Sequence, residues 1–318
     1  MKETELIKKY FSPLAKNFSD ALNLEDDAAK LKNYKNNNYI ISVDNFIQGV
    51  HCPIFLSEKL IALRAIFCAT SDLAAMGVSP YCIFLSISIP KKKSSFVIKK
   101  LVRGIKQAIN TLGIKVAGGD LTSYDGPIAI NVTAVGKKNK NEKILLRKGG
   151  RENDCLAVTG LIGEAFIGLK LLEKKIKISY RLNKKRAIDS FIYPPQLHEF
   201  SKELVNYANC CIDISDGLIG DVGKLGAYSN CCAILSSKNI PLSKLAKSLL
   251  ENRLFSLKEL LTAGDDYQLA FSFDKKNLTN IKKLSKSYNL KISVIGHLKK
   301  GKGVYVDKKI IEGGYSHI

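Results

Sequence analysis

The stretch Asp213-Ile-Ser-Asp-Gly-Leu218 constrains the fold of this chain more than any other segment. It follows an apolar run from Ala208 to Ile212. After it, apolar and aromatic residues recur every three to four positions, as in a helix, at Leu218, Val222, Leu225 and Tyr228. These residues predict a strand that passes through an acidic turn into a helix. Such a junction suits a hard cation, because Gly217 lets a ligand approach the backbone closely. The alternative interpretation is an Asp helix cap with a Ser turn, which needs no ligand.

Acidic residues also stand beside small or apolar neighbours in several other segments, namely Asp26-Asp27-Ala-Ala, Ser42-Val-Asp44, Ser71-Asp72-Leu-Ala-Ala-Met-Gly77, Gly118-Gly-Asp120 and Gly264-Asp-Asp-Tyr267. The chain has 50 Lys and Arg residues against 29 Asp and Glu residues. In such a basic chain, acidic residues gathered at the ends of secondary-structure elements indicate a site for several divalent ions. Carboxylates that share one place repel one another unless cations neutralise them.

Taken in order, these motifs, together with Leu24-Glu-Asp-Asp-Ala-Ala and Gly49-Val-His51, resemble those of the thiamine-monophosphate kinase family. This family is part of the aminoimidazole-ribonucleotide-synthetase-like group of ATP-using enzymes. The resemblance covers nearly the whole chain. It implies an α/β (α+β) fold of two domains, and a homodimer in which the N-terminal sheets of two chains pair into a barrel.

The resemblance also implies an activity and a set of site residues. The activity is the ATP-dependent phosphorylation of thiamine monophosphate to thiamine diphosphate, the final step of thiamine diphosphate synthesis, with several magnesium ions and with ATP as co-substrate. The implied metal-binding residues are Asp27, Ser42, Val43 through its carbonyl, Asp44, Asp72, Asp120, Asp213 and Asp216. The implied ATP contacts are Gly119, Asp120, Arg147 and Ser215. The implied contacts with thiamine monophosphate are His51, Asp265 and Tyr315.

The residue types agree with phosphoryl transfer, which needs positioning and charge neutralisation more than covalent chemistry. Arg147 lies in the segment Arg147-Lys-Gly-Gly150, where a guanidinium could clamp phosphate oxygens. Asp72 interrupts an apolar helical pattern, and such a carboxylate is costly to bury unless it is paired. We expect Asp72, Asp120 and Asp216 to be the most critical residues. No residue is typical of a general base or a phosphorylated nucleophile, so direct in-line attack by the substrate phosphate is favoured.

Some of these residues also have simpler interpretations. His51 could cap a turn before Pro53, and Tyr315 could be a residue of an unattached tail. The chain also departs from the family pattern at several positions. Glu25 stands in place of Gly, Gln48 and Asp265 each in place of Glu, and Ala69-Thr70 in place of Asn-Leu. The Asp265 side chain is one methylene shorter than the Glu of the family. This difference affects the predicted substrate contact more than the predicted metal site.

Hydrophobic periodicity predicts how the chain is organised. In the first half we expect strands at about 39–43, 81–89 and 128–136 and helices at about 57–76 and 94–112. The segment from Gly136 to Asp154 is rich in Lys, Asn and Gly, so it predicts a boundary between domains 1–137 and 150–318. In the second half we expect a strand at 155–159, a helix at 164–172, a helix start after Pro195, and strands near 292–295 and 304–306.

The formal net charge of +21 raises the possibility of a nucleic-acid-binding protein. The basic residues are mostly scattered Lys, without the aromatic-interleaved motifs of single-strand binders, so we do not expect a nucleic-acid partner. The eight Cys residues never form a Cys-x-x-Cys motif, which predicts small buried hydrophobic side chains in a reducing cytoplasm and no structural zinc. Neither a signal peptide nor a membrane span is expected, so the predicted location is the cytoplasm.

Two alternatives to the kinase remain open. One keeps the fold and ATP but changes the acceptor, as in purine-synthesis or selenophosphate-forming relatives. Gly49-Val-His51 and Gly264-Asp-Asp-Tyr267 disfavour the purine type, and the lack of Cys before Asp26 disfavours the selenium type. The other is a basic nucleic-acid-binding protein without catalysis, against which the full set of Asp residues argues.

Overall fold

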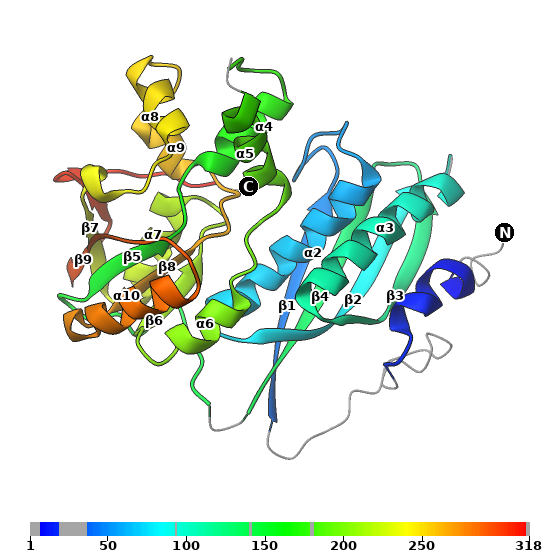
Figure 1. Cartoon of the computed structure of the whole chain (residues 1–318), viewed down its shortest axis with the longest axis horizontal. Helices are drawn as coiled ribbons and strands as arrows, with labels where there is room; N and C mark the ends of the chain where they lie inside the picture. Colours follow the sequence, from blue (N-terminus) through cyan, green and yellow to red (C-terminus); the bar gives the residue numbers. More distant parts are fainter. Residues whose placement is uncertain (1–6, 19–36, 93, 140–141, 179–180, 316–318) are drawn as a thin grey trace. The chain divides into compact units, whose positions relative to one another are not determined.

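The computed structural model describes residues 7–18, 37–92, 94–139, 142–178 and 181–315. The chain forms two compact units, which are described separately (Figure 1). The N-terminal unit extends to Leu73 and continues from Val78 to Glu142, and the C-terminal unit comprises Ala74–Gly77 and everything from Lys143 onward. Asp27, one of the predicted metal ligands, lies outside the described residues.

The N-terminal unit is a sheet with the strand order β1-β4-β2-β3, in which β2 and β3 are parallel and the other neighbours antiparallel. Two short helical turns, η1 (Ile7–Phe11) and η2 (Ser12–Ala15), come first. The main elements are β1 (Asn37–Ile47), α2 (Glu58–Ala75), β2 (Ser79–Pro90), α3 (Ser94–Leu112), β3 (Lys115–Tyr124) and β4 (Ala129–Asn139).

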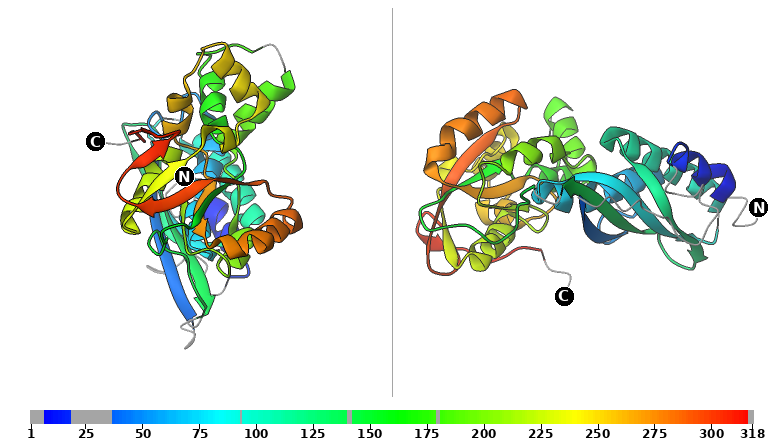
Figure 2. Two further views of the ribbon diagram at one scale, coloured as in Figure 1. Left: turned by 90° about the vertical axis from the view of Figure 1, so that its left-hand side faces the viewer. Right: turned by 90° about the horizontal axis from the view of Figure 1, so that it is seen from below.

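Buried and exposed residues alternate along β2, which shows which face of this sheet is covered. Ile83, Leu85 and Ile87 are buried, whereas Ser86 between them is exposed. Helices α2 and α3 lie across the face that the buried residues line (Figures 1 and 2). The two helices touch at Gly104, where a Cβ atom would lie only 2.0 Å from the carbonyl oxygen of Lys59. A side chain at this position would therefore push the helices apart.

The opposite face of the sheet is more open at its β1 edge. Ile41 and Val43 are 60% and 61% exposed, which is unusual for aliphatic side chains at the centre of a strand. Beside them, the Asn131 amide donates a hydrogen bond to the Asn45 side chain over 3.0 Å. An edge strand with exposed aliphatic residues is a surface that a partner strand or sheet can cover.

The C-terminal unit is a mixed sheet with the strand order β11-β10-β7-β9-β5-β8-β6. Its strands are β5 (Cys155–Thr159), β6 (Cys210–Asp213), β7 (Cys231–Leu235), β8 (Leu269–Phe273), β9 (Ile292–Lys300), β10 (Val304–Val306) and β11 (Lys309–Ile310). Its helices are α4 (Glu164–Leu172), α5 (Arg181–Ile192), α6 (His198–Leu204), α7 (Leu218–Tyr228), α8 (Lys244–Glu251), α9 (Leu257–Thr262) and α10 (Leu278–Ser287), with short turns η4 (Ser237–Asn239) and η5 (Lys275–Asn277).

Helices cover both faces of this second sheet. Along β6, Cys210 and Ile212 face a core that α7 completes, and Cys211 between them faces a core that α6 and α10 complete. A third cluster, in which Ile167 and Leu260 take part, joins α4, α5, α8 and α9. Because β6 is buried on both faces, its apolar sequence runs without a polar alternation up to Asp213.

Several predicted elements are confirmed. The elements α3, α4, β5 and β10 have the predicted bounds, and β1, α2, β2 and β4 differ from the prediction by a few residues at their ends. Strands β3, β7 and β8 were not predicted from the sequence. Seven of the eight cysteine side chains are buried and Cys155 is half-buried, as expected. Within the ranges that the structure describes, no helix combines the length and the apolar character needed to cross a membrane.

Candidate functional site

In the N-terminal unit, two predicted metal ligands lie in direct contact. Ser42 in β1 donates a hydrogen bond from its hydroxyl to the carboxylate of Asp72 in the last turns of α2, and both residues are half-buried. Asp44 stands opposite Val132 in the β1–β4 ladder, so it lies on the same helix-covered face as Ser42. This face therefore presents hydroxyl and carboxylate oxygens, which are hard ligands suited to magnesium.

Asp120 lies elsewhere in the same unit. It is an exposed residue inside β3, beside Ser86 in the parallel β2–β3 ladder, so it is on the face opposite Asp44. Its neighbour Gly119 packs so closely on β2 that a Cβ atom would lie 1.9 Å from the Leu85 carbonyl oxygen. The expectation that the acidic residues gather at element ends is thus wrong for Asp44 and Asp120. The structure places both within strands, where the pleat rather than a turn orients them.

His51 holds a turn, as its simpler interpretation suggested. Its Nδ1 atom accepts a hydrogen bond from the backbone N–H of Ile47 over 2.9 Å, and its ring stacks on Phe46 at a centroid distance of 5.6 Å. The neutral ring then carries its proton on Nε2. Gln48 supports the same turn, because its amide donates to the Ile54 carbonyl over 2.7 Å, which the family's Glu could not do.

In the C-terminal unit, the acidic turn follows β6 as predicted. Asp213 is the buried last residue of β6, and Gly217 precedes α7 with a φ of 105°. A Cβ atom at Gly217 would lie 2.7 Å from the carbonyl carbon of Thr262, so only glycine fits both the backbone angle and the space. The turn therefore depends on close contact with the end of α9.

Backbone hydrogen bonds join this turn to the Gly264–Tyr267 loop. Ile214 donates to the Gln268 carbonyl over 2.7 Å, Tyr267 donates to the Ile214 carbonyl over 2.8 Å, and Asp265 donates to the Ser215 carbonyl over 2.9 Å. The predicted ATP contact Ser215 and the predicted substrate contact Asp265 are thus adjacent. Asp265 has a φ of 76°, a left-handed conformation that Asp tolerates better than most residues, which gives a physical reason for Asp in place of the family's Glu.

Asp216 is paired with a cation from the chain itself. Lys224, two turns into α7, donates to the Asp216 carboxylate and, over 2.9 Å, to that of Asp221. Asp221 is 1% exposed and also accepts the Asp216 backbone N–H over 2.9 Å. Burial raises the pKa of Asp221 against the opposing effect of Lys224. Burial alone would lower the pKa of Lys224, but its hydrogen bonds to Asp216 and Asp221 outweigh that effect and raise it.

Sequence reasoning missed Asp221 and Lys224. The available signal was their spacing of three residues on a helix that begins after an acidic turn, which places both side chains on one face near Asp216. It also missed Asp266, which was treated only as part of a motif.

The loop that carries Arg147 is anchored to β6 and to the residue that follows α7. Cys211 donates its N–H to the Leu146 carbonyl over 3.0 Å, and Gly150 donates to the Ser229 hydroxyl over 3.0 Å. Gly149 has a φ of 120°, and a Cβ atom there would lie 2.8 Å from the Asn209 carbonyl oxygen. Arg147 itself is exposed, so its guanidinium is presented at the end of a well-held loop.

The C-terminal segment also reaches the acidic turn. Tyr315 donates its backbone N–H to the Asp216 carbonyl over 2.8 Å, although half of its surface is exposed. Gly220 and Gly314 make this approach possible, because a Cβ atom at Gly220 would lie 3.3 Å from the Gly314 Cα atom. Tyr315 is therefore attached at its backbone, and the unattached-tail interpretation is wrong.

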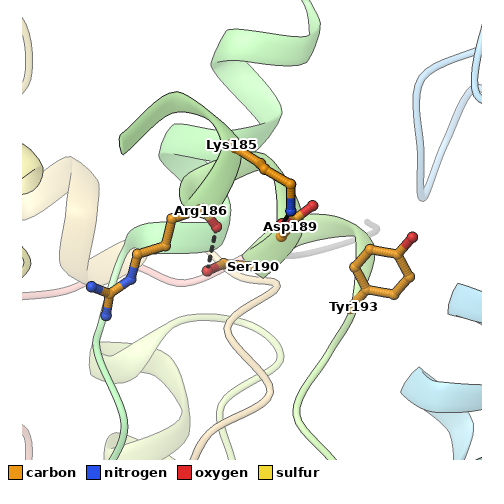
Figure 3. Close-up of a pocket in the computed structure, with 5 residues that line it drawn as sticks. All are labelled: Lys185, Arg186, Asp189, Ser190 and Tyr193. Atoms are coloured by element: carbon orange, nitrogen blue, oxygen red, sulfur yellow. Dashed lines mark hydrogen bonds and ion pairs between the residues drawn. The ribbon is translucent and has the colours of Figure 1, made fainter. Parts of the chain in front are cut away.

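An open hollow of about 420 Å³ lies elsewhere in this unit, along α5 (Figure 3). It is lined by Lys185, Arg186, Asp189, Ser190 and Tyr193. Lys185 pairs with Asp189, and the Ser190 hydroxyl donates to the Arg186 carbonyl over 3.0 Å. None of the predicted site residues lines this hollow, so it is distinct from the acidic turn.

Among the residues that the structure describes, no three His, Cys, Asp or Glu side chains are grouped as ligands of one metal ion. Magnesium does not require such a group, because it keeps several waters and takes one or two carboxylates together with substrate phosphates. In the N-terminal unit, Ser42 and Asp72 bring a hydroxyl and a carboxylate together. In the C-terminal unit, the ammonium of Lys224 bonds to Asp216, which shows that this carboxylate accepts a positively charged partner. The residues therefore fit magnesium.

Two family models match most of the chain. The N-terminal domain of AIR synthase related proteins matches residues 25–137, and the C-terminal domain of the same proteins matches residues 151–309. The hydrogenase maturation protein HypE from E. coli has a TM-score of 0.80 but is 17% identical, covering 99% of this chain and 98% of its own, so it shows the fold alone. The chain is a two-domain AIR-synthase-related protein of mixed α/β structure.

Relatives with higher sequence identity identify the family within this group more exactly. The thiamine-monophosphate kinase of Buchnera aphidicola subsp. Schizaphis graminum is 34% identical over 99% of this chain and 98% of its own length. A structure described as AaThiL complexed with AMPPCP and TMP has a TM-score of 0.80 at 27% identity, covering 100% of this chain and 99% of that one. The thiamine-monophosphate kinase of Stenotrophomonas maltophilia K279a also has a TM-score of 0.80 at 27% identity, covering 90% of each chain. The chain belongs to the thiamine-monophosphate kinase family.

Proposed function

We propose that this chain transfers the γ-phosphate of ATP to thiamine monophosphate and so forms thiamine diphosphate. The observation that carries the proposal is the likeness, over the full length, to a structure complexed with AMPPCP and TMP. AMPPCP stands in for ATP. In the reaction, a phosphate oxygen of thiamine monophosphate forms a bond to the γ-phosphorus while the bond to the β–γ bridging oxygen breaks, and ADP leaves.

In this proposal the acidic residues hold magnesium. The ligands in the N-terminal unit would be Asp27, Ser42, the Val43 carbonyl, Asp44, Asp72 and Asp120. Those in the C-terminal unit would be Asp213 and Asp216. Bound magnesium neutralises phosphate charge and draws the phosphate groups together. The direct contact between Ser42 and Asp72 supports this assignment, because it brings two hard oxygen donors together before any ion binds.

The remaining residues orient the two substrates. Arg147 and Ser215 would contact ATP, with Gly119 leaving room for it, while His51, Asp265 and Tyr315 would contact thiamine monophosphate. Asp265 offers a negative charge to the cationic thiazolium, and Tyr315 offers an aromatic face. The backbone bond between Asp265 and Ser215 supports this division, since it holds the two substrate contacts side by side.

We also propose that the enzyme is a homodimer in which the open faces of two N-terminal sheets close into a barrel. The exposed Ile41 and Val43 on edge strand β1 support this, because pairing would bury both. Asp120 lies on that open face, so the dimer would bring it to the interface.

The test is an assay with magnesium, ATP and thiamine monophosphate, in which thiamine diphosphate is followed by chromatography. We expect product from the wild type and a loss of about 100-fold or more in Asp72→Asn, because the neutral amide cannot neutralise a cation. Asp125→Asn is the matched control, since its carboxylate is 83% exposed in the same unit and only pairs with Lys91. ATP consumption without thiamine diphosphate would mean that the acceptor is wrong, and no ATP consumption at all would refute the kinase.

A further inference from the structure

Asp266 is a buried carboxyl that the proposed reaction does not use. It is 4% exposed, and its carboxyl contacts the first turn of α4. Its Oδ2 atom accepts the Gly163 N–H over 2.7 Å, and its Oδ1 atom accepts the Ala165 N–H over 3.3 Å. These donors belong to the first turn of a helix, whose N–H groups have no partner within the helix itself.

The loop around Asp266 is strained and is held from two sides. Asp265 and Tyr267, its two neighbours, have left-handed φ values of 76° and 47°, which cost free energy for residues other than glycine. On one side, the backbone bonds to Ile214 and Ser215 hold the loop against the acidic turn. On the other side, Asp266 ties it to α4. A strained loop persists only where its surroundings determine its shape, so both attachments matter.

We propose that Asp266 is a positioning residue that fixes Asp265 for thiamine monophosphate by anchoring the Gly264–Tyr267 loop to the N-terminus of α4. The inference rests on the proposed function. The side chain of Asp266 binds the first turn of α4, while the backbone of Asp265, the residue before it, is bonded to Ser215. The anchor at Asp266 therefore acts on the position of Asp265 through the chain. Loss of the anchor leaves the backbone bonds to the acidic turn in place, so the unit should stay folded. The loop would then be held from one side only, which allows Asp265 to shift.

The consequence should appear in substrate binding. A carboxylate displaced by about 1 Å loses much of its effect on a bound ligand. ATP contacts on Ser215 are held by β6 and α7 as well as by the loop, so they should change less. We therefore expect an effect on thiamine monophosphate that is larger than the effect on ATP.

The test compares Asp266→Ala and Asp266→Asn with Asp274→Ala. Asp274 is the control because it also caps a helical turn in this unit, where it accepts the Lys276 N–H over 3.0 Å. Calorimetry without ATP measures the Kd for thiamine monophosphate, and kinetics measure KM and kcat. In Asp266→Ala we expect Kd and KM for thiamine monophosphate to rise about tenfold, with kcat changing less than about threefold. Asp266→Asn keeps an oxygen acceptor and should stay close to wild type, as should Asp274→Ala.

The possible results distinguish failure of the proposed Asp266 anchor from failure of the proposed kinase activity. If the wild type neither binds nor phosphorylates thiamine monophosphate, the proposed function fails and this inference falls with it. If the wild type binds and Asp266→Ala has a lower Tm with unchanged Kd and KM, Asp266 is only a structural cap and the inference alone is refuted. If Asp266→Ala does not fold, Asp266→Ser decides, because its shorter hydroxyl side chain cannot reach both N–H groups that Asp266 binds. A Kd equal to that of the wild type in this variant would refute the anchor.

Discussion

At the scale of single residues, the charge of the acidic turn before α7 is partly neutralised by a lysine of the same chain. Lys224 bonds to both Asp216 and the buried Asp221, and Asp221 in turn accepts the Asp216 N–H. A buried carboxylate without a partner would destabilise the unit, so the lysine has a structural role. The Lys224 ammonium also bonds to the Asp216 carboxylate, which we propose as a magnesium ligand. Magnesium must therefore compete with the ammonium for Asp216.

Lys224→Met tests both roles. Loss of the ammonium leaves Asp221 with fewer partners, so we expect the free energy of unfolding to fall by about 1–3 kcal/mol. The increase in Tm on adding magnesium should be larger than in the wild type, because Asp216 no longer has a competing cation. Urea unfolding and thermal scans with and without magnesium measure these effects. Lys185→Met, which removes a surface pair with Asp189, should change neither, and an unchanged magnesium response in Lys224→Met would contradict the competition.

Asp266 predicts a pH dependence of stability. Burial raises its pKa to about 8, with Asp265 and Glu164 adding to the rise and the N–H groups of Gly163 and Ala165 opposing it. An unfolded Asp has a pKa of about 3.9, so the folded form retains a proton that the unfolded form releases as the pH rises. The stabilising contribution is therefore fully present below about pH 4 and is lost as the pH rises toward 8.

Urea unfolding at about pH 5 and about pH 8 measures this contribution. Asp266→Asn resembles the protonated side chain and does not titrate, so its stability should fall less between the two values than that of the wild type. Asp274→Asn is the control, because the pKa of Asp274 is lowered by its hydrogen bonds to Lys276 and it remains ionised throughout this range. Equal slopes in wild type and Asp266→Asn would contradict the raised pKa.

At the scale of elements, the pairing of α2 with α3 determines where Asp72 lies. The two helices meet at Gly104, against the Lys59 carbonyl, and α2 carries Asp72 to its contact with Ser42 on β1. The sequence predicts both helices, because their apolar residues repeat with helical spacing. It does not predict that Gly104 is the point of contact, since a glycine inside a helical pattern has no periodic signal.

Gly104→Ala should show the importance of this contact. The added Cβ atom would lie 2.0 Å from a backbone oxygen, which cannot move as a side chain can, so the helices must separate. We expect the free energy of unfolding to fall by about 1–3 kcal/mol, even though Ala is the better helix former. Denaturant unfolding measures the change. Arg103→Ala, at the exposed neighbouring position, should stay within about 0.5 kcal/mol, and equal stability of the two variants would show that the helices adjust without strain.

At the scale of the whole molecule, the open face of the N-terminal sheet predicts assembly. Ile41→Asp places a charge where the proposed dimer would bury an aliphatic side chain, so we expect dissociation to monomers. Light scattering after size-exclusion chromatography measures the mass. Leu254→Asp is the control, because Leu254 is 54% exposed in the other unit. A wild type that is already monomeric, or an Ile41→Asp variant that remains dimeric, would contradict the proposed barrel.

Elements with a local signal could be predicted from the sequence alone. Periodicity located α4 and β5, and the acidic turn was recognised because an apolar run, a Gly and a helical repeat follow one another. Strands β3, β7 and β8 were missed. β3 contains a pair of glycines, and β7 and β8 are short strands buried on both faces, so none of them shows the polar–apolar alternation of a half-buried strand.

The contacts that support the acidic residues join segments that are far apart in the sequence. Asp72 meets Ser42 across 30 residues of sequence, and Asp266 meets Gly163 across 103. The sheet register places Asp120 on the face opposite Asp44, which no local pattern distinguishes. Such contacts depend on how elements pack, because burial and hydrogen bonding between distant segments follow from the fold and not from the spacing of residues along the chain.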